Sequence, residues 1–166
     1  WQVKHNPSRR ATLGKLFDKH GSDKGSQKHD YQRVYEPIFE PVRDQPINIL
    51  EVGVFRGESL KVWHEYFPNA NIFGLDVFTR TRPEDIDILK EARVHGIKGD
   101  STAPGLTAFI REEYGVEFDF IIDDGLHTPK ANAQTFLNLF PFLKPGGTYF
   151  IEDVWPLELM TKEELA

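Results

Sequence analysis

The stretch ILEVGVFRG, residues 49–57, decides how this chain folds. It is an apolar run that leads into Gly53 and Gly57, two glycines in the spacing G-x-x-x-G. A short apolar run followed by a glycine turn and a helical pattern is typical of a parallel strand that passes into a helix. Ligands of open parallel sheets bind beyond the carboxyl ends of such strands. The stretch therefore predicts a sheet and also the edge at which its site lies.

Short apolar runs of this kind recur along the chain. Five are expected to be buried strands, at residues 47–52, 72–76, 94–98, 118–122 and 149–151. Segments with a helical spacing of apolar residues separate them, at residues 59–66, 83–92, 106–114 and 129–143. Strands that alternate with helices favour a parallel sheet, because parallel strands need crossover connections. We predict a doubly wound α/β fold with a mostly parallel sheet and helices on both faces.

Residues 1–45 precede the first strand and are expected to form a helical extension. One amphipathic helix is predicted over residues 8–20, with Ser8 as its cap and Gly21 as its stop. A second helical stripe follows over residues 31–42, where two prolines should kink or shorten the helix. The extension is expected to pack on or over the sheet.

Composition places the chain among globular proteins and excludes several classes. Its 166 residues fit one domain, residues 1–166, with residues 46–166 as the cofactor-binding core. Twenty basic and 26 acidic side chains give a net charge of −6, which disfavours a general nucleic-acid surface. No stretch approaches a membrane span, so we expect no membrane partner. The chain has no cysteine, which excludes disulfides and thiolate metal sites and is compatible with the cytoplasmic location that we expect.

Polar residues stand at the ends of the first three predicted strands. Gly53 and Gly57 would let a ligand approach the backbone, and Asp76 could accept hydrogen bonds from two ribose hydroxyls. Asp100, followed by Ser101, could accept a hydrogen bond from an adenine amino group. The glycine spacing differs from that of dinucleotide folds, and no Gly-Lys-Ser/Thr follows for a triphosphate. Each feature alone is also compatible with a simple turn, but together they favour an adenosyl ligand.

Four carboxylates crowd the ends of the last two strands. Asp123 and Asp124 follow the fourth strand, and Glu152 and Asp153 follow the fifth. Like charges so close destabilise one another unless a cation or polar groups offset them, and oxygen ligands suit Mg²⁺ or Ca²⁺ better than zinc. The alternative is that the acids cap the helices that follow. His127 is either a functional group of this site or a polar loop residue.

Several of these motifs resemble a known family. A pattern that resembles that of class I S-adenosylmethionine-dependent methyltransferases occurs at residues 49–54, 74–76, 99–100 and 145–147. The macrocin and mycinamicin sugar O-methyltransferases have motifs that resemble residues 21–25, 34–37, 121–127 and 151–153. This second resemblance covers nearly the whole chain.

The resemblance implies a Rossmann-like sheet in the order 3-2-1-4-5, and we expect it to lack the last two strands of that fold. It also implies S-adenosylmethionine as cofactor, Mg²⁺ held by Asp124, Glu152 and Asp153, and His127 as general base. The cofactor contacts that we expect are Lys24, Glu51, Gly53, Gly57, Asp76, Asp100, Ser101 and Asp123.

The leading hypothesis is therefore an enzyme that transfers a methyl group to a hydroxyl of a small molecule, such as a sugar of a natural product. Two alternatives stay open. One is a non-catalytic module that binds S-adenosylmethionine, and the other is a metal-dependent hydrolase or hydroxylase on a similar sheet. A homo-oligomer is compatible with each of them.

Overall fold

The computed structural model describes residues 10–156, 160 and 161. Within them lies a five-stranded sheet in the order β3-β2-β1-β4-β5, and every neighbouring pair is parallel. The strands are β1 (Asn48–Val52), β2 (Asn71–Asp76), β3 (Val94–Lys98), β4 (Phe118–Asp123) and β5 (Leu143–Ile151). Val52 pairs with Leu75 on one side and with Asp123 on the other, so the carboxyl ends of three strands are level. The predicted fold and strand order are confirmed.

The fifth strand is longer than the predicted run of residues 149–151. It begins at Leu143 and includes Pro145, Gly146 and Gly147, residues that are rarely found inside a strand. Among the described residues β5 pairs only with β4, and an edge position tolerates a proline that donates no hydrogen bond.

Five α-helices connect and flank the strands: α1 (Leu13–His20), α2 (Gln32–Phe39), α3 (Glu58–Tyr66), α4 (Leu106–Glu113) and α5 (Pro129–Leu139). Short 3₁₀ turns add η2 (Glu40–Val42), η3 (Pro83–Asp85), η4 (Asp87–Lys90) and η5 (Phe140–Phe142). The prediction of one helix over residues 83–92 is wrong. Ile86 has an extended backbone between two turns, and only Ile86 and Ile88 of this segment are buried, a spacing that gives no helical stripe.

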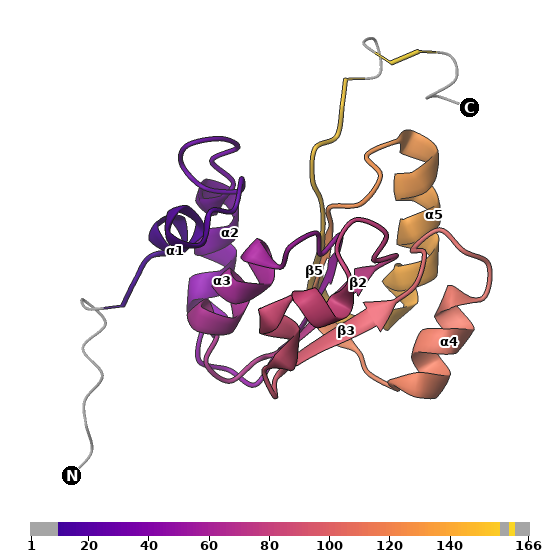
Figure 1. Ribbon diagram of the computed structural model, residues 1–166, viewed down its shortest axis with the longest axis horizontal. Helices are drawn as coiled ribbons and strands as arrows, with labels where there is room; N and C mark the ends of the chain where they lie inside the picture. The colour runs from indigo at the N-terminus through magenta and orange to yellow at the C-terminus, as the bar shows by residue number, and fades with distance from the viewer. Residues whose placement is uncertain (1–9, 157–159, 162–166) are drawn as a thin grey trace.

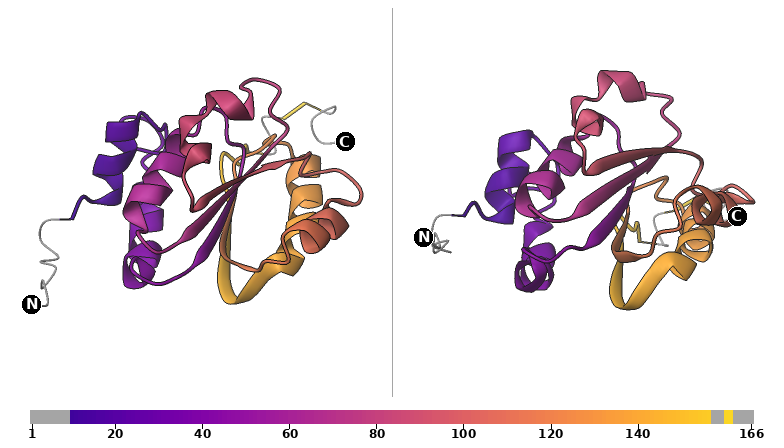
Figure 2. Two further views of the ribbon diagram at one scale, coloured as in Figure 1. Left: turned by 60° about the horizontal axis from the view of Figure 1, so that its bottom comes forward. Right: turned by 90° about the horizontal axis from the view of Figure 1, so that it is seen from below.

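The helices form two layers with the sheet between them (Figure 1). Helices α1, α2 and α3 cover one face, and α4 and α5 cover the other, as the two turned views also show (Figure 2). Each layer has its own apolar core: Phe17, Trp63 and Phe120 belong to the first, and Leu50 and Leu139 to the second. The extension was expected to pack on or over the sheet. The structure adds that α1 and α2 lie on the same face as α3 and share its core.

The ends of α1 follow local capping rules. Its N-cap is Thr12, whose hydroxyl accepts from the N–H of Lys15 at 3.5 Å, and Gly21 ends it at φ +73° as predicted. The predicted cap, Ser8, lies outside the described residues. Pro37 lies inside α2, which ends at Phe39 before a 3₁₀ turn, so the stripe is shortened as expected. No described helix has both the length and the apolar character that a membrane crossing requires.

Candidate functional site

The glycine turn after β1 brings two strand ends into backbone contact. Gly53 has φ +91°, and a Cβ atom there would lie 2.2 Å from the carbonyl oxygen of Asp124. Gly57 has φ +79° at the start of α3, where a Cβ would lie 2.7 Å from Cγ2 of Ile88. Only glycine fits both positions without displacement of the neighbouring chain.

A cavity of about 410 Å³ opens at the carboxyl ends of β1, β2, β3 and β4. Six of the predicted site residues line it: Gly53, Asp76, Asp100, Ser101, Asp124 and His127. The other predicted cofactor residues, Lys24, Glu51, Gly57 and Asp123, are not part of this lining. The structure thus brings together six predicted residues around the cavity. The other four predicted cofactor residues lie outside its lining.

Asp76, at the end of β2, accepts hydrogen bonds from backbone segments around the cavity. Its Oδ2 accepts from the backbone N–H groups of Val54 at 2.8 Å and Phe55 at 3.2 Å. Its Oδ1 accepts from the N–H of Phe78 at 2.7 Å. A carboxylate has about four acceptor positions, so these three bonds hold the side chain in place and leave it able to accept from a ligand.

Asp100 and Ser101 continue the wall beyond β3. Oδ1 of Asp100 accepts from the N–H and the hydroxyl of Thr102, which closes a local turn and keeps the aspartate exposed at the cavity. The hydroxyl of Ser101 lies 2.8 Å from that of Thr135, which belongs to α5. This wall is therefore held by the local turn at Asp100 and by the contact of Ser101 with helix α5.

Three of the predicted functional residues converge at the rim of the cavity. Asp124, His127 and Asp153 each offer one ligand atom, and these atoms lie within 4.8 Å of one another. Nε2 of His127 is 3.6 Å from Oδ1 of Asp124, while its Nδ1 is buried without a hydrogen-bond partner among the described residues. Such a group could hold a divalent cation, or could hold and release a proton.

Glu152 is engaged elsewhere. Its Oε1 accepts from the hydroxyl of Tyr35 and its Oε2 from the ammonium of Lys24. Burial raises the pKa of Glu152, against the opposing effect of Lys24. Asp124 and Asp153 thus lie in the group around His127, while Glu152 is held next to Asp124 by Lys24, and its place in the predicted metal set stays a prediction.

Two further predicted cofactor residues are buried next to this cluster. Glu51 is 0% exposed and accepts through Oε2 from the hydroxyl of Ser59 and the indole N–H of Trp63. Burial raises the pKa of Glu51 to about 7 although Lys24 opposes the shift. Lys24 is 2% exposed: burial alone would lower its pKa, but the carboxylates around it raise the pKa above its ordinary value. A direct cofactor contact by either residue stays a prediction.

Asp123, the last residue of β4, is 1% exposed and does not line the cavity. Its Oδ1 accepts from the N–H of Gly125 at 3.3 Å, and its Oδ2 has no partner among the described residues. Burial raises the pKa of this carboxyl to about 6. The alternative that the acids cap the following helix is wrong for α5, because Thr128 is its N-cap and accepts from Ala131 at 3.3 Å.

Residues of the extension reach the rim, and the sequence reasoning missed them. The hydroxyl of Tyr31 donates to Oδ1 of Asp153, and burial together with this bond raises the pKa of Tyr31 to about 12. Tyr35 donates to Glu152 from the next turn of the same helical segment. Two signals point to them: both tyrosines belong to the predicted helical stripe at a spacing of four residues, and Tyr35 lies in the family-like motif of residues 34–37.

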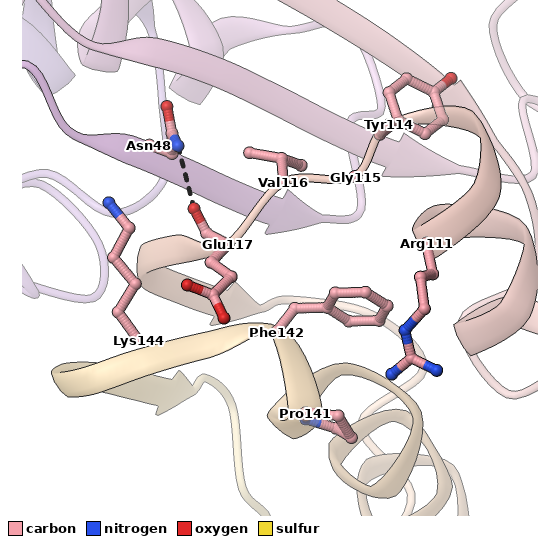
Figure 3. Close-up of a pocket in the computed structure, with 9 residues that line it drawn as sticks. All are labelled: Asn48, Arg111, Tyr114, Gly115, Val116, Glu117, Pro141, Phe142 and Lys144. Carbon is pink, nitrogen blue, oxygen red and sulfur yellow. Dashed lines mark hydrogen bonds between the residues drawn. The ribbon is translucent and has the colours of Figure 1, made fainter.

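A second cavity, of about 680 Å³, lies at the opposite edge of the sheet (Figure 3). It is formed at the amino ends of β1, β4 and β5, where Asn48 donates to the carbonyl oxygen of Glu117 at 2.9 Å. Arg111 of α4 and Phe142 of the 3₁₀ turn η5 also line it. None of the predicted site residues lines this cavity, so the candidate chemistry belongs to the smaller one.

Comparison with known proteins identifies the family of this chain. The profile of a family described as a methyltransferase domain matches residues 50–154. The chain belongs to this methyltransferase family. The match runs from β1 to just beyond β5, so it contains the glycine turn, the cavity and the acidic rim. The resemblance found in the motifs is thereby confirmed.

Curated relatives of this methyltransferase chain act on sugars of natural products according to their names. It is 38% identical over 160 residues to 8-demethyl-8-(2-methoxy-alpha-L-rhamnosyl)-tetracenomycin-C 3'-O-methyltransferase of Streptomyces olivaceus, covering 92% of this chain and 39% of that protein. It is 32% identical to mycinamicin VI 2''-O-methyltransferase of Micromonospora griseorubida, covering 89% of this chain and 37% of that protein. The chain therefore spans less than half the length of these relatives.

Solved structures agree with this assignment. The mycinamycin methyltransferase MycE in complex with Mg, SAH and mycinamycin VI has a TM-score of 0.76 at 32% identity, covering 88% of this chain and 40% of that one. Fibrillarin from Aeropyrum pernix, at 22% identity and a TM-score of 0.55, covers 67% of this chain and 46% of its own and shares the fold.

Proposed function

We propose that this chain binds S-adenosylmethionine in the 410 Å³ cavity and takes part in methylating a hydroxyl of a small molecule, a sugar of a natural product, with the help of Mg²⁺. The observation that carries the proposal is the meeting of His127, Asp124 and Asp153 at the rim of a cavity built from strand ends. The names of the relatives support the acceptor class. A cytoplasmic location and a homo-oligomer stay predictions.

The cavity fits an adenosyl ligand. Gly53 leaves the floor of the turn free of side-chain atoms, and Asp76 and Asp100 present carboxylates from two neighbouring strand ends. Vicinal ribose hydroxyls and an adenine amino group are the donors that such acceptors match. When bound, S-adenosylmethionine supplies a methyl group on a positively charged sulfur, which suits an acidic cavity.

The rim fits a hard divalent cation. Asp124 and Asp153 offer carboxylate oxygens within reach of one another, and the orphaned Nδ1 of His127 shows that polar capacity at the rim is unfilled. Mg²⁺ prefers such oxygen ligands and retains positions for the oxygens of an acceptor, whose hydroxyl pKa it lowers. Glu152, the third predicted ligand, accepts one hydrogen bond on each oxygen, from Tyr35 and Lys24, and keeps acceptor capacity for a cation.

His127 is proposed as the general base. It lines the cavity, and its side chain is 30% exposed, so a hydroxyl in the cavity can reach the imidazole. An alkyl hydroxyl is a poor nucleophile at neutral pH, and an imidazole is suited to remove its proton. Asp124 beside it would stabilise the imidazolium that results. With His127 as the base, Asp124 and Asp153 are left as the ligands of the proposed cation.

The decisive experiment is calorimetry with S-adenosylmethionine, followed by mass spectrometry of glycosylated acceptors for the gain of one methyl group. We expect affinity in the low micromolar range, about −7 to −8 kcal/mol. Asp76→Ala should weaken binding by about 1 to 3 kcal/mol, because a ribose hydroxyl loses its acceptor. Asp87→Ala, which removes an exposed carboxylate paired with Lys90, is the control. Unchanged affinity in Asp76→Ala would remove that residue from the site.

His127→Ala tests the base. The variant should lower the methylation rate by ~10² to 10⁴ and leave cofactor affinity intact, since the imidazole is assigned to the acceptor. His95→Ala, on β3 and stacked on Phe73, should change neither quantity. Cofactor binding without any methylated product would instead favour the non-catalytic module. Conversion of the acceptor without S-adenosylmethionine and without the gain of a methyl group would favour the hydrolase or hydroxylase.

A further inference from the structure

One buried ammonium joins the extension to three neighbouring strands. Lys24 lies in the loop between α1 and α2, at 2% exposure. Its Nζ is 2.5 Å from Oδ2 of Asp124 and 3.6 Å from Oε1 of Glu51, and it also donates to Oε2 of Glu152. The three carboxylates belong to the ends of β4, β1 and β5, which are adjacent in the sheet. A single ammonium therefore lies among three carboxyl groups.

The ammonium offsets the cost of ionising these buried carboxyls. Glu51 and Glu152 are 0% and 5% exposed, and two buried carboxylates without a counter-charge repel each other and lose their hydration. Tyr35 donates a neutral hydrogen bond to Glu152 and adds no charge. Among the described residues Lys24 is the only lysine or arginine paired with Glu51, Glu152 or Asp124.

The ammonium also decides which oxygen of Asp124 faces the rim. Oδ2 is held by Lys24, so Oδ1 is the oxygen that lies 3.6 Å from Nε2 of His127. The side chain of Asp124 is 23% exposed and stands between the buried cluster and the cavity. Lys24 thus acts on the rim through Asp124 while lying outside the cavity lining.

We propose that Lys24 is a resident counter-cation and positioning residue, which keeps the carboxylates of Glu51, Asp124 and Glu152 assembled while no divalent cation is bound. The proposal rests on the proposed metal at Asp124 and Asp153. It has two consequences of opposite sign. The ammonium stabilises the metal-free chain, and its positive charge weakens the binding of a second cation at Asp124, the carboxylate that both contact. A lysine that served only packing would have the first effect and not the second.

Lys24→Met tests the second consequence, because methionine keeps most of the apolar stem and removes the charge. Mn²⁺, titrated by electron paramagnetic resonance, is the probe. We expect Lys24→Met to bind Mn²⁺ about tenfold more tightly than wild type, since the carboxylate set is then more negative by one charge. Lys24→Arg should bind Mn²⁺ as wild type does. Equal or weaker binding by Lys24→Met overturns the proposal.

Tyr35→Phe is the matched control. It removes a hydrogen bond to the same Glu152 but no charge, so it should lower the unfolding temperature and leave the Mn²⁺ affinity within about twofold of wild type. Tighter Mn²⁺ binding in Tyr35→Phe would show that any loosening of the cluster has this effect, and the counter-cation role would be lost.

Metal-free stability tests the first consequence independently of the proposed metal. In the presence of a chelator Lys24→Met should unfold roughly 5 to 10 °C below wild type. Adding Glu152→Gln to this variant should recover part of the loss, because one uncompensated charge disappears. Absence of recovery overturns the counter-cation role. If wild type binds no Mn²⁺ but the recovery occurs, the proposed metal fails and the role of Lys24 as counter-cation survives.

Discussion

Single residues at the strand ends determine where the walls of the site lie. Gly53 shows how little space is available there for a side chain. Its backbone at φ +91° and the carbonyl oxygen of Asp124 leave no volume for a side chain. The same contact holds the end of β1 against the loop that carries Asp124 and His127. A change at Gly53 should therefore affect the stability of the chain and the geometry of the rim together.

We expect Gly53→Ala to lower the free energy of unfolding by about 2 to 4 kcal/mol, from backbone strain and the displacement of Asp124 together. Urea denaturation measures it. Gly105→Ala is the control, because Gly105 has φ +90° and nothing within 4 Å of its would-be Cβ. It should lose only the conformational part, about 1 kcal/mol. Equal losses in the two variants would mean that the contact with Asp124 is easily relieved.

Among the elements, α5 begins directly after His127. Thr128 is its N-cap, and the hydroxyl accepts from Ala131 at 3.3 Å. Thr128→Ala should lower stability by about 1 kcal/mol, because one N–H at the helix start loses its acceptor. Chemical denaturation checks this, with Thr128→Ser as the variant that keeps the hydroxyl. A loss of the same size in Thr128→Ser would assign the effect to the methyl group and not to the cap.

Helix α3 carries a pH-dependent contribution at His64. Burial, and then the charge of Arg93, lower the pKa of His64 below its ordinary value. As the pH falls, His64 is therefore protonated in the unfolded chain before it is protonated in the folded chain. The free energy of unfolding decreases as the pH falls through about 6.5, the ordinary pKa, towards the lower pKa of the folded state. The free energy of unfolding should drop between pH 7.5 and pH 5.5 by less in His64→Gln than in wild type. Equal drops would remove His64 from the pH dependence.

At the scale of the whole molecule, an aromatic cluster unites the extension with the sheet. The ring centroid of Phe39 in α2 lies 4.7 Å from that of Phe120 in β4, 5.6 Å from that of Trp63 and 5.7 Å from that of Phe150. Phe39 is fully buried. The predicted single domain, residues 1–166, stays a prediction, but a shared core of this kind favours it.

Phe39→Ala should cost about 3 to 5 kcal/mol, and the extension and the sheet should still unfold in one transition. Circular dichroism in urea, combined with hydrogen exchange of α1 and β1, provides the measurement. Phe109→Ala, at a position that is 40% exposed, should cost much less. Exchange of α1 well before β1 would show that the extension is a separate folding unit.

The sequence by itself determined the features that depend on neighbouring residues. The apolar runs and glycine turns predicted the strands and a parallel sheet, because alternation of strands and helices leaves few topologies, while the strand order was what the family resemblance implied. The acids at the strand ends were placed at one edge for the same reason, and six predicted residues line the cavity. The segment of residues 83–92 was predicted wrongly because its few apolar residues resemble a helix until their burial is known.

Only the tertiary structure decided how the charges are paired. Lys24 meets Asp124 and Glu152 across 100 and 128 positions of sequence, and Tyr31 meets Asp153 across 122. Periodicity along a helix or strand indicates on which side of that element a residue lies. It does not indicate which residue of another element will contact it. Glu152 could therefore be assigned to a metal from its position after β5, while its actual partners depend on how α2 and the preceding loop pack against the sheet.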